Sequence, residues 1–311
     1  MYEQYYGFQR KPFDLLPNPD FLFLSETHKK AITYLNYGLT EMAGFILLTG
    51  EVGSGKTTVI RGFMRKLGQK VRMASVFNTK VTTEELLCLV NEDFGLPSAN
   101  RNKAQLIKDL YRHLMDNHSK GIHSVLIIDE AQNLSVDVLE EIRMLSNLET
   151  DSSKLLQIVL VGQPELKQQL ARTEMRQLRQ RIGVNCNLMP LNNDETMAYI
   201  YHRLTVAGNG NAVQFEADAL DQIYRASRGI PRLINMICDY LLLSAFTEQI
   251  KKIDAEMVND IVEDLDIKQH FNKPKQSSPE REQPAKKGID YNALLNALGV
   301  ASGENPAMKR S

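Results

Sequence analysis

Apolar residues along this chain follow two patterns. Short, nearly continuous apolar runs, typical of strands buried on both faces, are separated by longer stretches in which apolar residues recur every three or four positions, as on one face of a helix. This alternation predicts an α/β fold in which helices flank a parallel sheet. The strand-like runs are GFILLTG (44–50), KVRMASVF (70–77), HSVLIIDE (123–130), LLQIVLVGQ (155–163) and IGVNCNLMP (182–190), and helical patterns between them include 84–94, 103–118 and 136–148.

The pattern changes on either side of this region. After Pro190 no strand-like run remains, and residues 192–266 indicate a small all-helical domain. Before it, a proline- and aromatic-rich segment leads into a helix from Thr27 to Met42, with Thr27 as its N-cap. We therefore expect an N-terminal segment and helix (1–43), an α/β core (44–190) and a helical lid (191–266). The lid helices are expected at 194–206, 217–227, 231–247 and 255–265.

The last part of the chain has a different composition. Residues 267–288 are polar, charged and proline-containing, so we expect a disordered linker that buries little apolar surface. In the short tail that follows (289–311), IDYNALLNALGV has the spacing of one short amphipathic helix. It would be either a docking peptide or a frayed tail.

Composition excludes several classes of protein. The chain has 311 residues, 43% hydrophobic, and its apolar runs fall far short of the roughly 18 residues that span a bilayer. The opening MYEQYYGFQRKPF lacks the apolar region of a secretory signal, so we expect a cytoplasmic protein. Three cysteines without CxxC spacing and six histidines without an HExxH pattern argue against zinc or a disulfide framework. A net charge of −1 gives no overall attraction for nucleic acid.

The strongest chemical signal lies between the first strand-like run and a helical stretch. Its glycines let the backbone turn so that N–H groups surround phosphates, and the next helix adds a favourable dipole. Lys56 would hold the β- and γ-phosphates and Thr57 would ligate Mg²⁺, so the chain is predicted to bind ATP with Mg²⁺; the alternative is a chance glycine-rich turn. The residues that fit GxxxxGK[ST] are Gly50, Glu51, Val52, Gly53, Ser54, Gly55, Lys56 and Thr57, followed by Thr58.

A second apolar strand ends in two adjacent carboxylates. Val125–Ile128 is followed by Asp129 and Glu130, downstream of the phosphate-binding loop. Polar residues commonly follow buried strands, but together with that loop they indicate a Walker B strand. Asp129 would support the Mg²⁺ site of Thr57, and Glu130 would orient and polarise the attacking water.

The next apolar run, Ile158–Val161, ends in Gly162, Gln163 and Pro164. In many NTPases with this layout, a polar residue at the tip of the strand beside Walker B contacts the γ-phosphate or the attacking water. Gln163 is the candidate for that role. A turn-forming Gly-Gln-Pro sequence without a catalytic role is the alternative.

Arginines in two places are candidates for contact with the γ-phosphate. Arg176, Arg179 and Arg181 precede the last strand-like run, and Arg179 or Arg181 is expected to reach the nucleotide of a neighbouring subunit. Arg232 follows Pro231 at the start of a lid helix and would face back toward the nucleotide. The alternatives are a solvated charged helix for the first group and an exposed first-turn arginine for Arg232.

The order of these motifs, GEVGSGKTT, LIIDEAQNL, GQPEL, LRQRI and GIPRLIN, resembles that of the ExeA-type (general secretion pathway protein A) AAA+ ATPases, in particular the short secretion-ATPase forms associated with exopolysaccharide and protein-sorting loci. The opening segment is also similar, so the resemblance covers residues 1–266. It implies an AAA+ core with a helical lid, nucleotide at the subunit interface and ring-like homo-oligomers activated by an arginine in trans. It also implies that the segment around Phe13 and Pro17 packs near the adenine.

This sequence departs from the longer members of that family. They continue through a membrane span into a peptidoglycan-binding domain, whereas a polar linker and a short tail stand here. We therefore expect no direct membrane insertion. A membrane-bound partner in a secretion machine would hold the protein at the inner membrane, with residues 289–300 as the contact.

Two functions from different classes follow as expectations. The preferred one is ATP hydrolysis that drives assembly or remodelling of a cell-envelope secretion or exopolysaccharide export system. The rival is a DNA-binding AAA+ regulator of the transposition type, since such ATPases share the DEAQ-like Walker B. DNA is disfavoured because no helix-turn-helix is evident and the basic residues of the tail are interleaved with acidic ones. A slowly hydrolysing scaffold is a third alternative, although the presence of Glu130 argues against a dead enzyme.

Overall fold

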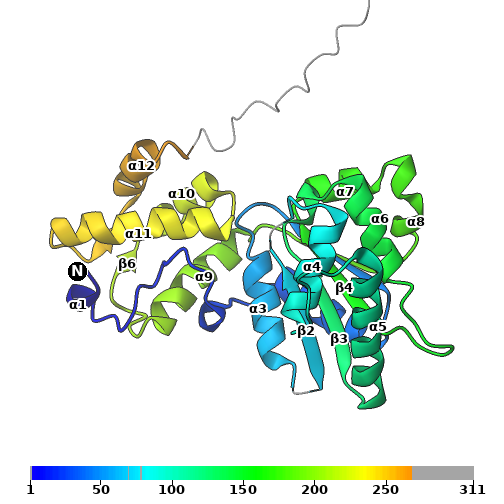
Figure 1. Cartoon of the computed structure of the whole chain (residues 1–311). Helices are drawn as coiled ribbons and strands as arrows, with labels where there is room; N and C mark the ends of the chain where they lie inside the picture. Colours follow the sequence, from blue (N-terminus) through cyan, green and yellow to red (C-terminus); the bar gives the residue numbers. More distant parts are fainter. Residues whose placement is uncertain (1, 69, 78, 268–311) are drawn as a thin grey trace, which may run out of the picture. The chain divides into compact units, whose positions relative to one another are not determined.

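The computed structural model describes residues 2–68, 70–77 and 79–267 (Figure 1). All of them belong to one compact unit of the chain. The predicted linker, apart from Ile267, and the predicted helix at 289–300 lie outside the described residues. Within the described ranges, no helix is both long and apolar enough to cross a membrane.

Five parallel strands form the central sheet, as the apolar runs predict. They are β1 (Phe45–Gly50), β2 (Val71–Val76), β3 (His123–Ile128), β4 (Leu156–Gly162) and β5 (Ile182–Leu188). Their order is β2-β3-β4-β1-β5. The inner strands β1 and β4 are buried at every residue, whereas buried and exposed residues alternate along the edge strand β5. The central strands are therefore almost wholly apolar, while β5 accommodates Asn185 and Asn187.

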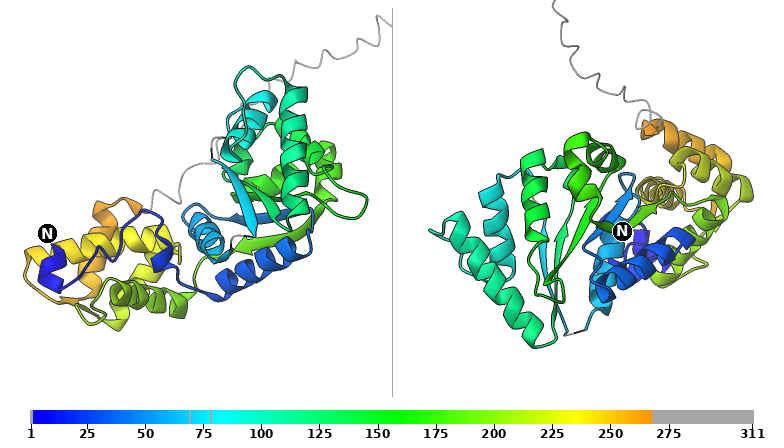
Figure 2. Two further views of the ribbon diagram at one scale, coloured as in Figure 1. Left: turned by 60° about the horizontal axis from the view of Figure 1, so that its bottom comes forward. Right: turned by 90° about the vertical axis from the view of Figure 1, so that its right-hand side faces the viewer.

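Helices cover both faces of the sheet (Figure 2). One layer contains α4 (Thr83–Asp93), α5 (Lys103–Ser119), α6 (Val136–Leu145), α7 (Pro164–Leu170) and α8 (Arg176–Arg179), and the other contains α2 (Glu26–Thr40) and α3 (Lys56–Lys66). Phe45 and Leu47 of β1 pack in the first layer, whereas Ile46 and Leu48 pack in the second. The two hydrophobic cores thus follow from the alternation of side chains along each strand.

Polar side chains fix where several helices begin. Capping boxes, in which the side chains of the N-cap and of the third helical residue bond each other's backbone N–H groups, open α4 and α5. In α2 the cap is Ser25, whose hydroxyl accepts the His28 N–H. The prediction of Thr27 as the cap was wrong, because the extended backbone that a cap requires occurs at Ser25 and the helix already begins at Glu26.

The described chain beyond β5 is mainly helical. Its helices are α9 (Asn193–Val206), α10 (Ala217–Ser227), α11 (Pro231–Thr247) and α12 (Ala255–Asp264), close to the predicted ranges. Two short strands that the sequence did not predict, β6 (Gln214–Phe215) and β7 (Lys252–Ile253), pair in parallel. Two residues are too few to show a strand periodicity, which is why they were missed.

The N-terminal segment first packs on the lid. A short helix, α1 (Tyr2–Tyr6), lies against α11, where the Tyr2 hydroxyl donates to Asp239 and the Tyr6 hydroxyl donates to the Leu242 carbonyl at 3.2 Å. The sequence did not predict α1. Its apolar side chains are aromatic and its stability comes from these contacts with a distant helix.

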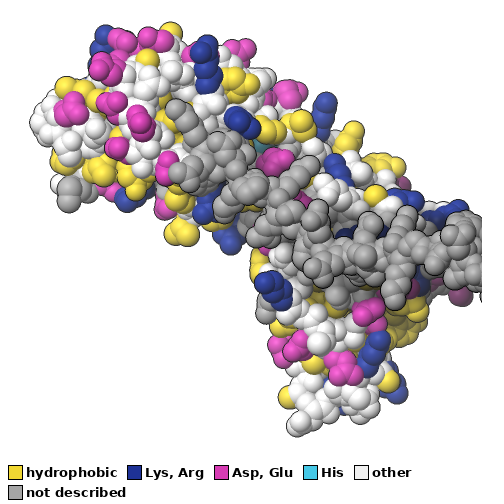
Figure 3. All heavy atoms as spheres, turned by 90° about the horizontal axis from the view of Figure 1, so that it is seen from above, with side chains coloured by type: hydrophobic (Ala, Val, Ile, Leu, Met, Phe, Trp, Pro, Cys, Tyr) yellow, Lys and Arg dark blue, Asp and Glu magenta, His cyan; other side chains and the backbone are white. Residues whose placement is uncertain are grey.

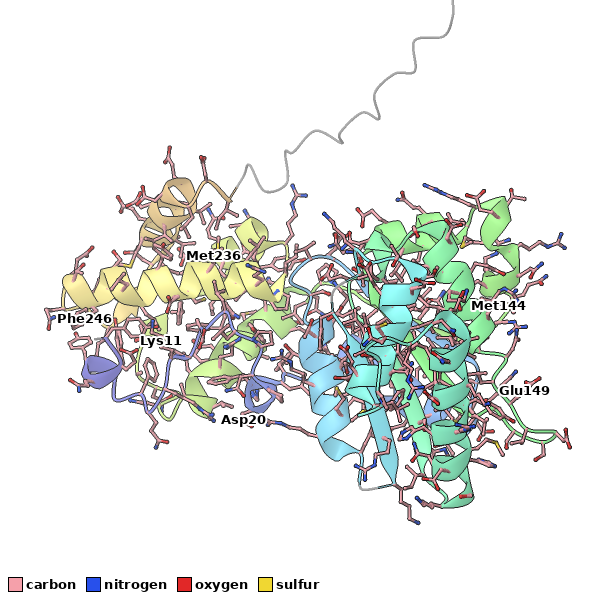
Figure 4. The ribbon with its side chains drawn as sticks, viewed as in Figure 1. Lys11, Asp20, Met144, Glu149, Met236 and Phe246 are labelled. Carbon is pink, nitrogen blue, oxygen red and sulfur yellow. The ribbon has the colours of Figure 1, made fainter. Side chains whose placement is uncertain are left out.

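The same segment then reaches the core. In Figure 4, Lys11 lies beside the lid helices and Asp20 lies toward α3. From α3, Arg61 donates to the Pro17 carbonyl at 3.0 Å and Arg65 pairs with Asp20 at 2.8 Å. The segment therefore joins the lid to the α/β core between residues 6 and 20.

Candidate active site

The loop between β1 and α3 has a backbone that favours glycine. Gly53 and Gly55 have φ angles of +81° and +95°, in the left-handed region. A Cβ atom on Gly53 would also lie 2.5 Å from the Cβ of Arg232, so the loop passes close to the lid. Backbone N–H groups at the start of a helix such as α3 are available to phosphate oxygens. The loop residues that line one cavity are Val52, Gly53, Gly55, Lys56, Thr57 and Thr58.

Lys56 is held inside this loop. Its Nζ donates to the carbonyls of Gly50 at 2.9 Å and Glu51 at 3.0 Å. Burial lowers the pKa of Lys56 from its ordinary value, and the carboxylates of Glu130 and Asp129 oppose that shift. The ammonium is thus placed beside the cavity with few water contacts, where a phosphate anion would favour its charged form.

Thr57 lines the cavity and is bonded to Asp129, which directly follows β3. The Thr57 hydroxyl donates to Asp129 Oδ2 at 3.1 Å, and Asp129 is buried. A hydroxyl and a carboxylate are the hard oxygen donors that Mg²⁺ prefers, so these two residues fit a Mg²⁺ site. No group of three or more His, Cys, Asp or Glu side chains in the described ranges has metal-binding geometry. Mg²⁺ commonly completes its coordination with phosphate oxygens and water, and ATP would supply the phosphates.

Glu130 follows β3 in a left-handed conformation, with φ of +52°. Its N–H donates to Asp129 Oδ1 at 2.9 Å, and its carbonyl accepts the Thr79 hydroxyl at 3.1 Å. Non-glycine residues in this region are uncommon and cluster at functional sites. The two hydrogen bonds fix the backbone of Glu130, and this residue lines the same cavity as the loop.

Gln163 lies at the tip of β4, beside β3 in the sheet. Its Nε2 donates to Glu130 Oε2 at 3.1 Å. Gln132, in the single turn Ala131–Asn133, also donates to Glu130 Oε2, at 2.5 Å. The sequence analysis did not single out Gln132. Its position two residues after Glu130 is the sequence signal that could have identified it.

The N-terminal segment and the lid form the other wall of the cavity. Pro17, which the family resemblance implies is near the adenine, lines this cavity. Phe13 is buried outside that lining, with the Arg203 guanidinium 6.0 Å from its ring centre. Other lining residues, for which the sequence carried no signal, include Leu15, Leu16, His28, Tyr199, Arg203 and Asn235.

Arg203 of the lid bonds to the N-terminal segment within this wall. Its guanidinium donates to the carbonyl of Pro12 at 2.5 Å, to the carbonyl of Asp14 at 3.1 Å and to the Tyr199 hydroxyl at 2.8 Å. It also lies 4.6 Å from the centre of the Phe21 ring. One buried cation of the lid therefore holds the N-terminal segment on both sides of Phe13.

His28 supports the loop from α2. Its Nδ1 lies 2.6 Å from the Ser25 hydroxyl, and a Cβ atom on Gly55 would lie 3.2 Å from its Nε2. Burial lowers the pKa of His28 below its usual value, and the Glu195 carboxylate opposes that shift. The ring is therefore neutral at neutral pH and packs against the phosphate-binding loop.

The candidate arginines divide into two groups. Arg232 lines the cavity, and its backbone N–H donates to the Gly53 carbonyl at 3.2 Å. Arg179 instead donates to the Leu170 and Ala171 carbonyls at the end of α7. Arg181 donates to residues at the end of α6 that include Ser146, at 2.7 Å. The structure therefore brings Arg232 to the loop of its own subunit and does not bring Arg179 or Arg181 there.

Comparison with known proteins decides the family. Residues 40–170 match the model of the AAA domain family. General secretion pathway protein A from Aeromonas hydrophila is 46% identical to the chain over 254 residues, which are 81% of this chain and 46% of that protein. The chain is an AAA+ ATPase of the ExeA type. It spans about half the length of that relative.

Other similarities agree with the fold of an ExeA-type ATPase. ATP-dependent target DNA activator B of Escherichia phage Mu is 30% identical over 148 residues, 47% of this chain and 43% of that protein. The Aeropyrum pernix ORC2 protein, solved as ADPNP–ADP complexes, superposes with a TM-score of 0.63 at 20% identity, over 82% of this chain and 72% of that one. Thermotoga maritima RuvB superposes with a TM-score of 0.54 at 18% identity, over 90% of this chain and 83% of that one. The predicted parallel sheet with a helical lid is thereby confirmed.

Proposed function

We propose that this ExeA-type ATPase hydrolyses ATP in the cavity lined by the loop between β1 and α3, by Glu130, by the N-terminal segment and by the lid. The loop backbone and Lys56 hold the phosphates, and the wall containing Pro17 takes the base. One observation carries the proposal: a phosphate-binding loop, the Thr57–Asp129 pair and the Glu130 carboxylate line or border a single cavity.

The chain's own residues account for the chemistry of hydrolysis. Mg²⁺, when bound with ATP, would neutralise charge on the β- and γ-phosphates, and Thr57 with Asp129 would hold it. Glu130 orients the attacking water and accepts its proton, and Gln163 lies beside both Glu130 and the expected γ-phosphate. Arg232 would report the phosphate state to the lid, because its backbone is bonded to Gly53.

A neighbouring subunit completes this site in our proposal. Arg179 or Arg181 would stabilise the transition state in trans, within a homo-oligomer such as a ring. Both side chains bond their own chain through NH1, which fixes their direction and leaves further donors on each guanidinium. Arg176 lies next to them and is exposed.

The process driven by hydrolysis is proposed from the similarity to general secretion pathway protein A, which extends over 81% of this chain. ATP turnover would drive assembly or remodelling of a cell-envelope secretion or exopolysaccharide export system. A membrane-bound partner at the inner membrane would receive that work, and the ATPase itself would stay on the cytoplasmic side.

A DNA-dependent regulator is the second candidate function. The similarity to ATP-dependent target DNA activator B favours it, but that similarity covers only 47% of this chain. On the face shown in Figure 3, Lys and Arg side chains are interspersed with Asp and Glu rather than gathered into one basic surface. Such a face offers little electrostatic attraction to a duplex.

ATP hydrolysis with and without duplex DNA, at low and at physiological salt, separates the two candidates. The account expects Mg²⁺-dependent turnover that DNA does not stimulate and that Lys56→Ala abolishes, because the loop loses its phosphate-binding cation. Lys108→Ala, on the exposed face of α5, is the matched control and should retain turnover. Turnover that DNA stimulates at low salt and loses as salt rises would instead support the regulator.

A further inference from the structure

Gln132 joins two parts of the site that come from different strands. Its Nε2 donates to Glu130 Oε2 at 2.5 Å, and its Oε1 accepts the backbone N–H of Gln163 at 3.0 Å. A Cβ atom on Gly162 would lie only 2.8 Å from Gln132 Oε1, so the amide packs closely on the tip of β4. One side chain thus links the carboxylate after β3 to the backbone of β4.

The Glu130 carboxylate is held from one side. Gln132 and Gln163 both donate to Oε2, so Oε1 is the oxygen that can receive the proton of a water. The backbone of Glu130 is already fixed by its bonds to Asp129 and Thr79. What the two amides add is therefore the orientation of the carboxylate about its last side-chain bonds.

We propose that Gln132 is a positioning residue for ATP hydrolysis. Its amide sets the orientation of the Glu130 carboxylate and links the position of that carboxylate to the tip of β4. The inference rests on the hydrolytic role proposed above for Glu130. A displacement of the tip of β4 would be transmitted to the Glu130 carboxylate, because the Gln132 amide is bonded to both. Gln132 itself would touch neither the phosphates nor the water.

The chemistry of the bridge explains why glutamine suits this position. It needs one donor and one acceptor at the end of a side chain of fixed length, and an amide supplies both without charge. Methionine keeps a similar length and bulk but supplies no comparable donor. Glutamate keeps an acceptor for the Gln163 N–H but places a second carboxylate against Glu130, which repels it.

The test compares Gln132→Met and Gln132→Glu with wild type in ATP turnover and in binding of a fluorescent ATP analogue. We expect kcat to fall about 10- to 100-fold in Gln132→Met, because misplacing a reacting group by about 1 Å has an effect of that size. A larger loss is expected in Gln132→Glu. Analogue affinity and KM should change little in both, since Gln132 does not line the cavity. Asn133→Ala, an exposed amide in the same turn, is the control and should match wild type.

A second pair of variants distinguishes positioning from a general loss of structure. Gln163→Ala and Gln132→Met together should lower kcat by less than the product of their separate effects, because both act on Glu130 Oε2. Multiplicative losses, a raised KM with unchanged kcat, or a wild-type kcat in Gln132→Met would each overturn the inference. If Glu130→Gln itself turned over at the wild-type rate, the proposed role of Glu130 would fail first, independently of Gln132.

Discussion

At the level of single residues, the site combines positions that are close in sequence with positions that only the fold brings together. Gly53, Gly55, Lys56 and Thr57 share one loop, so a local string was enough to predict their place. Asp129 was predictable because the carboxyl ends of all strands in a parallel sheet lie along one edge, although β4 separates β3 from β1. Gln132, His28 and Arg203 were not, because their contacts depend on tertiary packing.

Gly53 offers a prediction at this scale. Its φ of +81° and the 2.5 Å approach of a Cβ atom to Arg232 make Gly53→Ala strained in both backbone and side chain. We expect the substitution to lower the free energy of unfolding by about 1–3 kcal/mol and to weaken ATP-analogue binding at least about 10-fold. Chemical denaturation and a binding titration measure the two effects.

Gly68→Ala is the matched control for that substitution. A Cβ atom on Gly68 would meet no other atom within 4 Å. Its free energy of unfolding should stay within about 1 kcal/mol of wild type, with unchanged analogue binding. Equal effects at Gly53 and Gly68 would show that the geometry of the loop does not require glycine at position 53.

At the level of elements, periodicity predicted the regular core and missed the segments whose structure depends on distant contacts. The inner strands β1 and β4 were visible because burial on both faces selects apolar residues along the whole strand, whereas the edge strand β5 shows alternating burial. In contrast, α1 consists of five residues and is held by contacts with α11. The path of residues 6–20 between lid and core likewise has no periodic signal, although residues 14–18 line the proposed nucleotide cavity.

Arg203 tests whether that wall is held from the lid. In Arg203→Met the carbonyls of Pro12 and Asp14 lose a buried charged donor, so the free energy of unfolding should fall by about 2–4 kcal/mol. The KM for ATP should rise because the segment that lines the base side of the cavity is released. Chemical denaturation and steady-state kinetics on the same preparation measure both.

Arg225→Met provides the comparison for Arg203. Arg225 lies on α10 with a 70% exposed side chain and pairs with Asp221 at 2.7 Å. Exposed pairs of this kind contribute little, so the free energy of unfolding should change by less than about 1 kcal/mol and KM should not change. If Arg203→Met behaved like Arg225→Met, the proposed link between lid and N-terminal segment would be wrong.

At the level of the whole molecule, one subunit supplies most residues of the proposed hydrolytic centre. Residues of the loop, Glu130 and Arg232 line its cavity, and Asp129 is bonded to Thr57 beside it. Arg179 and Arg181 are instead bonded to the ends of α7 and α6. The account therefore assigns those arginines to a neighbouring subunit. An interface between copies leaves no periodic pattern within one chain, which is why the sequence did not indicate which of the two arginines acts in trans.

The most direct test is ATP turnover by Glu130→Gln, alone and mixed with Arg179→Ala or Arg181→Ala. The account predicts that Glu130→Gln binds ATP but has lost at least about 100-fold in turnover, as expected for removal of a general base. Mixing it with the effective arginine variant should restore activity, because some interfaces then combine an intact Glu130 with an intact arginine. Failure to restore activity in either mixture would contradict the arginine assignment. Wild-type turnover by Glu130→Gln alone would contradict the central claim that this carboxylate drives hydrolysis.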